Sequence, residues 1–140
     1  AAAFVGGVSG NAGLFSTTHD LAVIFQMLLD RGICGDRRYL SRATCDLFMG
    51  MKAKNSRRGL GFDKPDIESD DNSPCAPEAP ASVFGHTGFT GTCVWVDPDN
   101  ELVFVFLSNR TYPVAFGHDN LMKLDIRSRI QQAMYQSIMY

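Results

Sequence analysis

The sequence predicts an α+β fold in which helices flank an antiparallel β-sheet. Apolar residues recur at helical spacing early in the chain, and residues 83–107 change to strand-like patterning with a tight turn in the middle. A last helix is expected from about Asn120. Helices followed by antiparallel strands and a further helix are typical of helices packed on one sheet.

The first helix is expected directly after Thr17. This residue lies three positions before Asp20, a spacing that predicts a capping box in which each side chain bonds the other's backbone N–H. One apolar stripe follows at positions i, i+3, i+4, i+7 and i+8: Leu21, Ile24, Phe25, Leu28 and Leu29. Gly32 is expected to end the helix as a left-handed cap.

A second, shorter helix is expected after Ser41, which would be its N-cap, with Leu47, Phe48 and Met51 facing inward. Residues 59–62 resemble a short strand. Residues 63–80 are rich in acidic residues and prolines, so we expect a mobile surface loop that buries little.

The strands come next. Cys93–Val96 is one strand, and residues 97–100 form a turn with proline at its second position. Residues 102–107 are apolar throughout, which predicts a central strand covered by helices on both faces. The last helix is expected to turn these residues inward: Ile126, Ile130, Ala133, Met134 and Ile138. A sheet of about three strands is marginal for an independent core, so we expect one face or edge to lack its partner.

Composition narrows the classes of function. The chain has 140 residues, the length of one domain, and a net charge of −2, which argues against a nucleic-acid binder with a basic face. The apolar run 102–107 is far shorter than the roughly 20 residues that a membrane-spanning helix needs, and no signal peptide is visible. The chain opens on small apolar residues without Met, which we interpret as a cut inside a longer protein.

The metal-binding residue types show no ligand spacing. The four cysteines, Cys34, Cys45, Cys75 and Cys93, contain no C-x-x-C pair, and we expect unpaired, mostly buried thiols; a disulfide stays open if the protein is exported. His19 and His118 are expected to be exposed or capping residues. A joint site with His86 has no spacing signature, so neither a metal nor a cofactor is expected.

The candidate site is the segment from Gly85 to Gly91, Gly-His-Thr-Gly-Phe-Thr-Gly. Three glycines in seven residues weaken a strand, and usually indicate that the backbone bends or that another group approaches closely. His86 and Thr87 alternate faces, so one of them points toward that group. The alternative is a bulged edge strand with a structural histidine.

This segment resembles the K-T-G or H-T-G strand of the serine β-lactamase and penicillin-binding-protein superfamily. Further blocks are similar to class-C-like esterases and D-Ala-D-Ala carboxypeptidases, in order: residues 10–17, 20–22, 59–62, 84–92, 97–98 and 107–113. The resemblance covers nearly the whole chain. It implies that residues 1–140 are the C-terminal portion of a single β-lactamase/transpeptidase-like domain, whose missing N-terminal part would be its partner, and that the parent protein is exported.

The resemblance also implies a mechanism for that parent. A serine in S-x-x-K attacks an ester or amide carbonyl, and the backbone N–H of Phe89 would complete the oxyanion hole. Gly88 would let the substrate backbone lie close, while His86 and Thr87 would orient its polar groups. A neutral imidazole anchors a carboxylate less well than the lysine of many lactamases, which favours an esterase or peptidase. Arg110 is a candidate for a substrate carboxylate; the alternative is a surface arginine paired with a loop acid.

Two of the superfamily's motifs are absent from the 140 residues. No serine has a lysine three positions on, and no tyrosine is followed by x-Asn. The letters of S-x-N at residues 9–11 lie inside a block already matched to the Gly-rich loop, and we interpret them as coincidence. We therefore expect a chain that is inactive alone and whose parent acts on a small molecule or a peptidoglycan peptide. The alternative is a non-catalytic binding module, and an exposed sheet edge would favour self-association.

Overall fold

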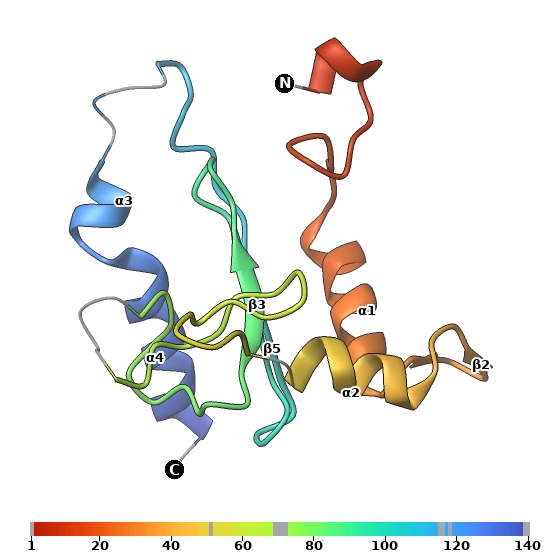
Figure 1. The fold of residues 1–140 in the computed structure, drawn as a ribbon. Helices are drawn as coiled ribbons and strands as arrows, with labels where there is room; N and C mark the ends of the chain where they lie inside the picture. The colour runs from red at the N-terminus through yellow and green to blue at the C-terminus, as the bar shows by residue number, and fades with distance from the viewer. Residues whose placement is uncertain (1, 51, 69–72, 115–116, 118, 139–140) are drawn as a thin grey trace.

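The computed structural model describes residues 2–50, 52–68, 73–114, 117 and 119–138. Its core is a three-stranded antiparallel sheet, β3 (Phe84–Thr87), β4 (Cys93–Asp97) and β5 (Leu102–Phe106). Four helices accompany it (Figure 1): α1 (Thr18–Leu29), α2 (Arg42–Gly50), α3 (Asn120–Lys123) and α4 (Ile126–Ile138). A short 3-10 helix (Ala2–Val5) and a small hairpin, β1 (Ile33–Cys34) with β2 (Arg37–Arg38), complete the elements. The predicted α+β fold class is confirmed.

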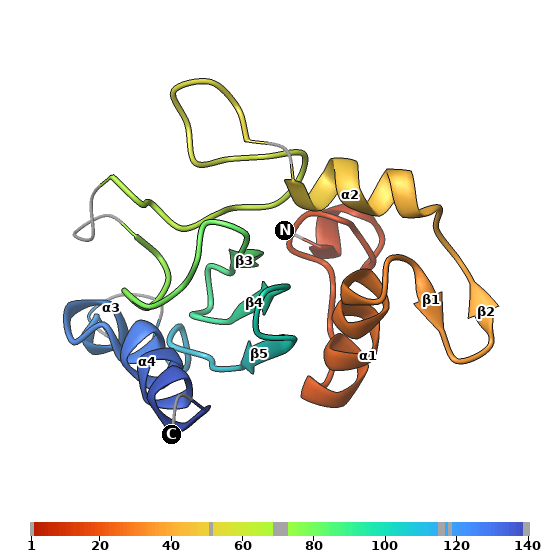
Figure 2. The same ribbon diagram turned by 90° about the horizontal axis from the view of Figure 1, so that it is seen from below.

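The sheet has the order β3-β4-β5, so β4 is its middle strand. The prediction that residues 102–107 form the central strand is therefore wrong for the described part of the chain, where β5 is an edge. Helices nevertheless cover both faces of β5: α1 lies on one side and α4 on the other (Figure 2). The apolar run reflects this double coverage by helices and not a second neighbouring strand.

Alternation along the strands divides the core in two. Trp95 and Phe104 pack with Tyr135 on the α4 side, while Phe84 and Val96 pack with α2 residues on the other side. Neighbouring strands contribute side chains to the same half of the core: Phe84 of β3 lies opposite Val96 of β4, and Trp95 of β4 lies opposite Phe104 of β5. The sheet is thus the middle layer of three.

The helix α1 begins where the sequence predicts. The Oγ1 of Thr17 accepts a hydrogen bond from the Asp20 N–H at 3.2 Å, but it donates to the Asp20 carboxylate at 2.9 Å, so the reciprocal bond of a full capping box is replaced by a side-chain pair. Arg31 and Gly32 end the helix at φ values of 54° and 88°. The apolar stripe is only partly covered, because Ile24 is 49% exposed.

The inward faces of α2 and α4 differ from those predicted. Cys45 and Met49 are the buried residues of α2, whereas Leu47 and Phe48 are exposed and Met51 lies outside the described residues. In α4 the buried residues are Ser128, Gln131 and Tyr135, and Ile126, Ile130, Ala133 and Ile138 are half-buried or exposed. Met134 alone of the predicted set packs against the core.

Specific hydrogen bonds explain why polar residues of α4 face inward. The Tyr135 hydroxyl donates to Asp97 Oδ2 at 2.7 Å, and Gln131 Oε1 accepts from the Ala76 N–H at 2.9 Å. Asp97 is the first residue of the predicted turn, and its Oδ1 accepts from the N–H groups of Asp99 and Asn100. A buried polar group with a partner is stable inside, and hydrophobic periodicity alone does not identify it.

The expected strand at residues 59–62 and the expected low burial of residues 63–80 are both wrong for the described residues. Residues 59–62 form a loop closed by a Gly59 N–H to Phe62 carbonyl bond, and strand-like pairing is limited to a single bridge from Asp63 to Gly85. The described parts of 63–80 also bury more than their composition suggested: Asp63, Lys64, Cys75, Ala76 and Ala79 are all buried. Small residues and paired charges can be enclosed despite flanking prolines. Residues 69–72 of this segment lie outside the described residues.

No helix in the described residues is long and apolar enough to cross a membrane.

Candidate functional site: the Gly85–Gly91 strand and turn

Gly85 lies against both backbone and an aromatic ring of the neighbouring strand. A Cβ at this position would meet the Val94 carbonyl and the ring of Trp95. On the outer edge of β3, Asp63 and Gly85 exchange two backbone hydrogen bonds of 2.7 and 3.1 Å. The close approach that the sequence indicates at this glycine is made by the protein itself, and the approaching groups are the Val94 carbonyl and the Trp95 ring.

Beyond β3 the chain turns tightly at residues 88–92. The Gly88 N–H donates to the Thr92 carbonyl at 2.7 Å, and the Gly91 N–H donates to the Gly88 carbonyl at 3.0 Å. Gly91 has a φ of 96°, which a side chain would strain, and a Cβ there would meet Leu121 and Ser108. The turn is therefore held in one conformation by its own backbone and by the elements around it.

Arg110, which lies outside this turn, stabilises it with two hydrogen bonds. The Arg110 backbone N–H donates to the Thr90 carbonyl at 2.9 Å, and the side-chain Nε donates to the Phe89 carbonyl at 2.8 Å. Its guanidinium lies 4.9 Å from the centre of the Phe89 ring, a cation–π contact. These contacts are with the predicted site residue Phe89, and Arg110 pairs with no loop acid among the described residues. Its binding of a substrate carboxylate stays a prediction.

Phe89 itself projects from the turn. Its side chain is 73% exposed, and its backbone N–H donates to no acceptor within the part of the chain that the structure describes. The N–H groups of Thr90 and Thr92 on the same turn likewise have no acceptor among the described contacts. Each of these N–H groups is a donor available to water or to another molecule.

His86 lies at the exposed surface of β3, where its ring touches two partners. Its Nε2 is 2.6 Å from Arg58 Nη1, and its Nδ1 is 2.6 Å from the carbonyl oxygen of Thr87. Arg58 comes from the loop before residue 59, so the structure brings together two residues that are 28 positions apart. Thr87 is half-buried and pairs with Cys93 in the sheet.

A buried carboxylate supports this arrangement. The side chain of Asp63 is fully buried, and it accepts from Arg57 Nε at 2.8 Å and Arg57 Nη2 at 3.2 Å. Arg58 Nη2 lies 3.5 Å from the second carboxylate oxygen, and the Lys64 N–H donates to the first at 3.1 Å. The Arg57–Asp63–Arg58 group was missed by the sequence analysis; its signal was the pair of arginines directly before the Gly59–Phe62 loop.

Burial shifts the pKa values of several groups behind the strand. Burial raises the pKa of the Cys93 thiol to about 11, an effect that nearby Arg127 partly opposes. The pKa values of Cys75 and Tyr135 are also raised, chiefly by burial. Burial lowers the pKa of Lys64, with a smaller contribution from Lys52. All four cysteines are unpaired thiols, and only Cys34 among them is not buried.

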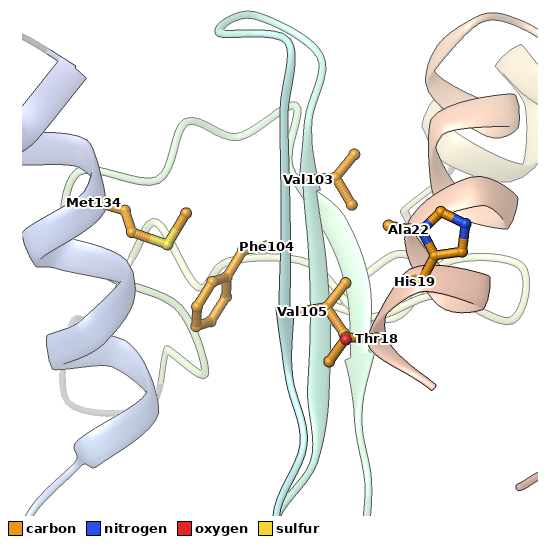
Figure 3. Close-up of a pocket in the computed structure, with 7 residues that line it drawn as sticks. All are labelled: Thr18, His19, Ala22, Val103, Phe104, Val105 and Met134. Carbon is orange, nitrogen blue, oxygen red and sulfur yellow. The ribbon is translucent and has the colours of Figure 1, made fainter. Parts of the chain in front are cut away.

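Two shallow hollows lie away from His86. One is formed between α1, β5 and α4: Figure 3 shows Val103 and Val105 pointing toward His19 on α1, and Phe104 pointing toward Met134 on α4. The second is lined by Arg110 and neighbouring residues up to Leu121. His86, Thr87 and Phe89 line neither hollow.

The histidines do not form a cluster with other metal-binding side chains in the described residues. No group of three or more His, Cys, Asp or Glu side chains that could hold a metal ion occurs there. His118 lies outside the described residues.

Known proteins match most of this chain in sequence. The model of the beta-lactamase family matches residues 1–126. A relative from Escherichia coli O157:H7, named "Putative D-alanyl-D-alanine carboxypeptidase", is 39% identical over 121 residues, which cover 83% of this chain and 27% of the relative. A relative of the same name from Salmonella gallinarum is 39% identical over 116 residues, which cover 79% of this chain and 26% of the relative. The chain thus spans about a quarter of the length of these curated relatives.

Part of a crystal structure of a beta-lactamase from Mycobacterium bovis has a similar fold. It superposes with a TM-score of 0.64 at 24% identity, over 87% of this chain and 44% of that one, a likeness of fold. The fold is therefore an α+β unit of the β-lactamase type. The chain belongs to the beta-lactamase family and is related to its serine hydrolases. The sequence-based prediction of this family is confirmed.

Proposed function

We propose that this chain supplies the H-T-G side of the active site of a serine hydrolase that works through an acyl-serine. In this proposal the Phe89 N–H is an oxyanion-hole donor, and His86, Thr87 and Gly88 line the substrate path. The substrate is an ester, an amide or a cell-wall peptide, and the names of the two curated relatives support the last of these.

One observation carries the proposal. The Phe89 N–H has no acceptor among the described residues, while the Gly88 carbonyl of the same peptide accepts from the Gly91 N–H and the Phe89 carbonyl of the next peptide accepts from Arg110. A donor contributes most to catalysis when it is already aimed before the reaction begins, and each such donor is worth about 2.7–4 kcal/mol of barrier. The Arg110 contact and the 88–92 turn supply that rigidity without occupying the N–H.

The chain's own residues also limit what it does alone. No S-x-x-K occurs in the 140 residues, so the nucleophile of this mechanism must come from other residues. We therefore expect no turnover from the 140-residue chain by itself. The same absence favours the second candidate, a non-catalytic module that binds a cell-wall peptide on this strand.

The test compares two proteins: the full open reading frame that encodes this chain, and the 140-residue chain. Each is incubated with a fluorescent penicillin and with a p-nitrophenyl ester. Labelling or hydrolysis by the first protein alone supports the proposal. Silence of both removes the hydrolase and leaves the binding module, which is then tested by titration with peptidoglycan peptides.

A further inference from the structure

His86 is held by two partners of fixed hydrogen-bonding character. Arginine is always a donor, because its guanidinium stays protonated in proteins, and a carbonyl oxygen is always an acceptor. The contact of 2.6 Å from Arg58 Nη1 therefore requires a lone pair on Nε2. The contact of 2.6 Å to the Thr87 carbonyl requires a hydrogen on Nδ1. One form satisfies both: the neutral imidazole with its hydrogen on Nδ1.

Arg58 is in turn held by a buried acid. Its Nη2 lies 3.5 Å from Asp63 Oδ2, and Asp63 is anchored to the strand that bears His86 by two backbone bonds to Gly85. The acid, the arginine and the imidazole thus form a series of contacts that begins at Asp63, which is bonded to Gly85 of β3, and ends at His86 on the same strand. Since the Arg58 side chain remains 49% exposed, its other donors can reach solvent or a ligand.

We propose that Arg58, held by Asp63, is a positioning residue that fixes His86 as the neutral Nδ1–H tautomer and supplies the positive charge at this point of the strand. His86 then presents a fixed ring whose nitrogens are both engaged, and it does not serve as a general base. The statement that His86 is not a general base rests on the function proposed above. The assignment of the Nδ1–H tautomer rests only on the two contacts of the ring.

The chain offers a matched control for this inference. Arg57 also binds Asp63, through Nε and Nη2, and its side chain is 33% exposed. Among the described contacts it makes no hydrogen bond to His86. Arg57→Leu and Arg58→Leu each remove one positive charge that pairs with Asp63, but only Arg58→Leu removes the hydrogen-bond donor to His86 Nε2.

The experiment is ¹⁵N NMR of the imidazole nitrogens in the uniformly labelled 140-residue chain at neutral pH, with His86 assigned by its loss in His86→Gln. We expect Nδ1 of His86 to carry the hydrogen and Nε2 to be unprotonated, the reverse of the tautomer that free histidine prefers. An Nε2–H tautomer or an imidazolium would overturn the inference.

The variants separate positioning from folding. We expect Arg58→Leu to move the His86 Nε2 resonance toward that of a free acceptor, Arg58→Lys to restore most of the shift, and Arg57→Leu to leave it unchanged. Equal shifts in Arg57→Leu and Arg58→Leu would overturn the role of Arg58. If Arg58→Leu does not fold, Arg58→Met, which keeps the unbranched stem and has no N–H donor, is compared with Arg58→Lys for the same decision. This measurement needs no enzymatic turnover. The inference about His86 can therefore be refuted while the hydrolase proposal stands, and the hydrolase proposal can be refuted while the inference about His86 stands.

Discussion

The buried carboxylate of Asp63 is the point where the structure predicts the largest effect of a single conservative change. Asp63→Asn keeps the size of the side chain but removes its charge and replaces one acceptor oxygen with a donor NH₂. That donor would face guanidinium groups that can only donate, so at least one of the bonds from Arg57 is lost.

The expected magnitude follows from burial. Breaking a fully buried ion pair costs about 3–5 kcal/mol because a charge is left without compensation. Here the charges left behind belong to Arg57 and Arg58, whose side chains are 33% and 49% exposed, so water compensates part of the loss. We therefore expect Asp63→Asn to lower the free energy of unfolding by about 2 kcal/mol.

Urea unfolding followed by the fluorescence of Trp95 measures this change. Trp95 is the one tryptophan of the chain, is 1% exposed, and packs against Gly85, the strand partner of Asp63. Asp36→Asn is the control, since Asp36 is exposed and its change should stay within about 0.5 kcal/mol. Equal unfolding midpoints for the two variants would refute the account of the buried carboxylate.

Four further outcomes are expected. In the protein encoded by the full open reading frame, Phe89→Pro removes the backbone donor and should lower kcat for ester hydrolysis about 10²–10³-fold, whereas Phe89→Leu should retain most activity; similar rates for the two would contradict the oxyanion role. Arg110→Met loses the bond to the Phe89 carbonyl and should lower kcat about tenfold in the same assay, because a less fixed donor stabilises the transition state less well; an unchanged kcat would show that the turn does not need this contact. Burial raises the pKa of the Cys93 thiol from 9.0 to about 11, so the free energy by which the protonated thiol favours the folded state is complete below pH 9 and is lost as the pH rises to about 11. Urea unfolding midpoints should therefore fall over that pH range, and they should fall less steeply in Cys93→Ala. Sedimentation velocity should show concentration-dependent self-association of the 140-residue chain, weakened by Leu107→Lys at the end of the β5 edge, and a monomer at high concentration would argue against it.

Strong local signals made part of the fold predictable. The Thr17 cap and the apolar stripe after it place α1, and the Asp97–Asn100 turn places the hairpin of β4 and β5. These features are encoded in residues that are close in sequence, which is why pattern and turn chemistry identify them.

Other features depend on tertiary partners that a single sequence does not reveal. Tyr135 faces inward because Asp97 accepts its hydroxyl, and Ala76 is buried because its N–H reaches Gln131. The position of β5 at the edge is a matter of strand order, which an apolar run does not specify.

The candidate site, like the fold, has some features that local sequence indicates and others that depend on tertiary contacts. The glycine-rich motif was singled out from local sequence, and the role predicted for Phe89 came from the family resemblance. The contact of Arg58 with His86 spans 28 positions and appears only in three dimensions. Arg110 was singled out for its place at the end of a strand, but its observed partners are the carbonyl and ring of Phe89.

The central claim is that Phe89 presents a catalytic backbone donor in an acyl-serine hydrolase. It is tested most directly by intact-mass spectrometry of the full open reading frame protein after brief exposure to a penicillin, comparing wild type with Phe89→Pro and Phe89→Leu. The account predicts a covalent adduct of the penicillin's mass that forms quickly in wild type and Phe89→Leu and far more slowly in Phe89→Pro. An adduct that forms equally fast in all three proteins, or in none of them, would contradict it.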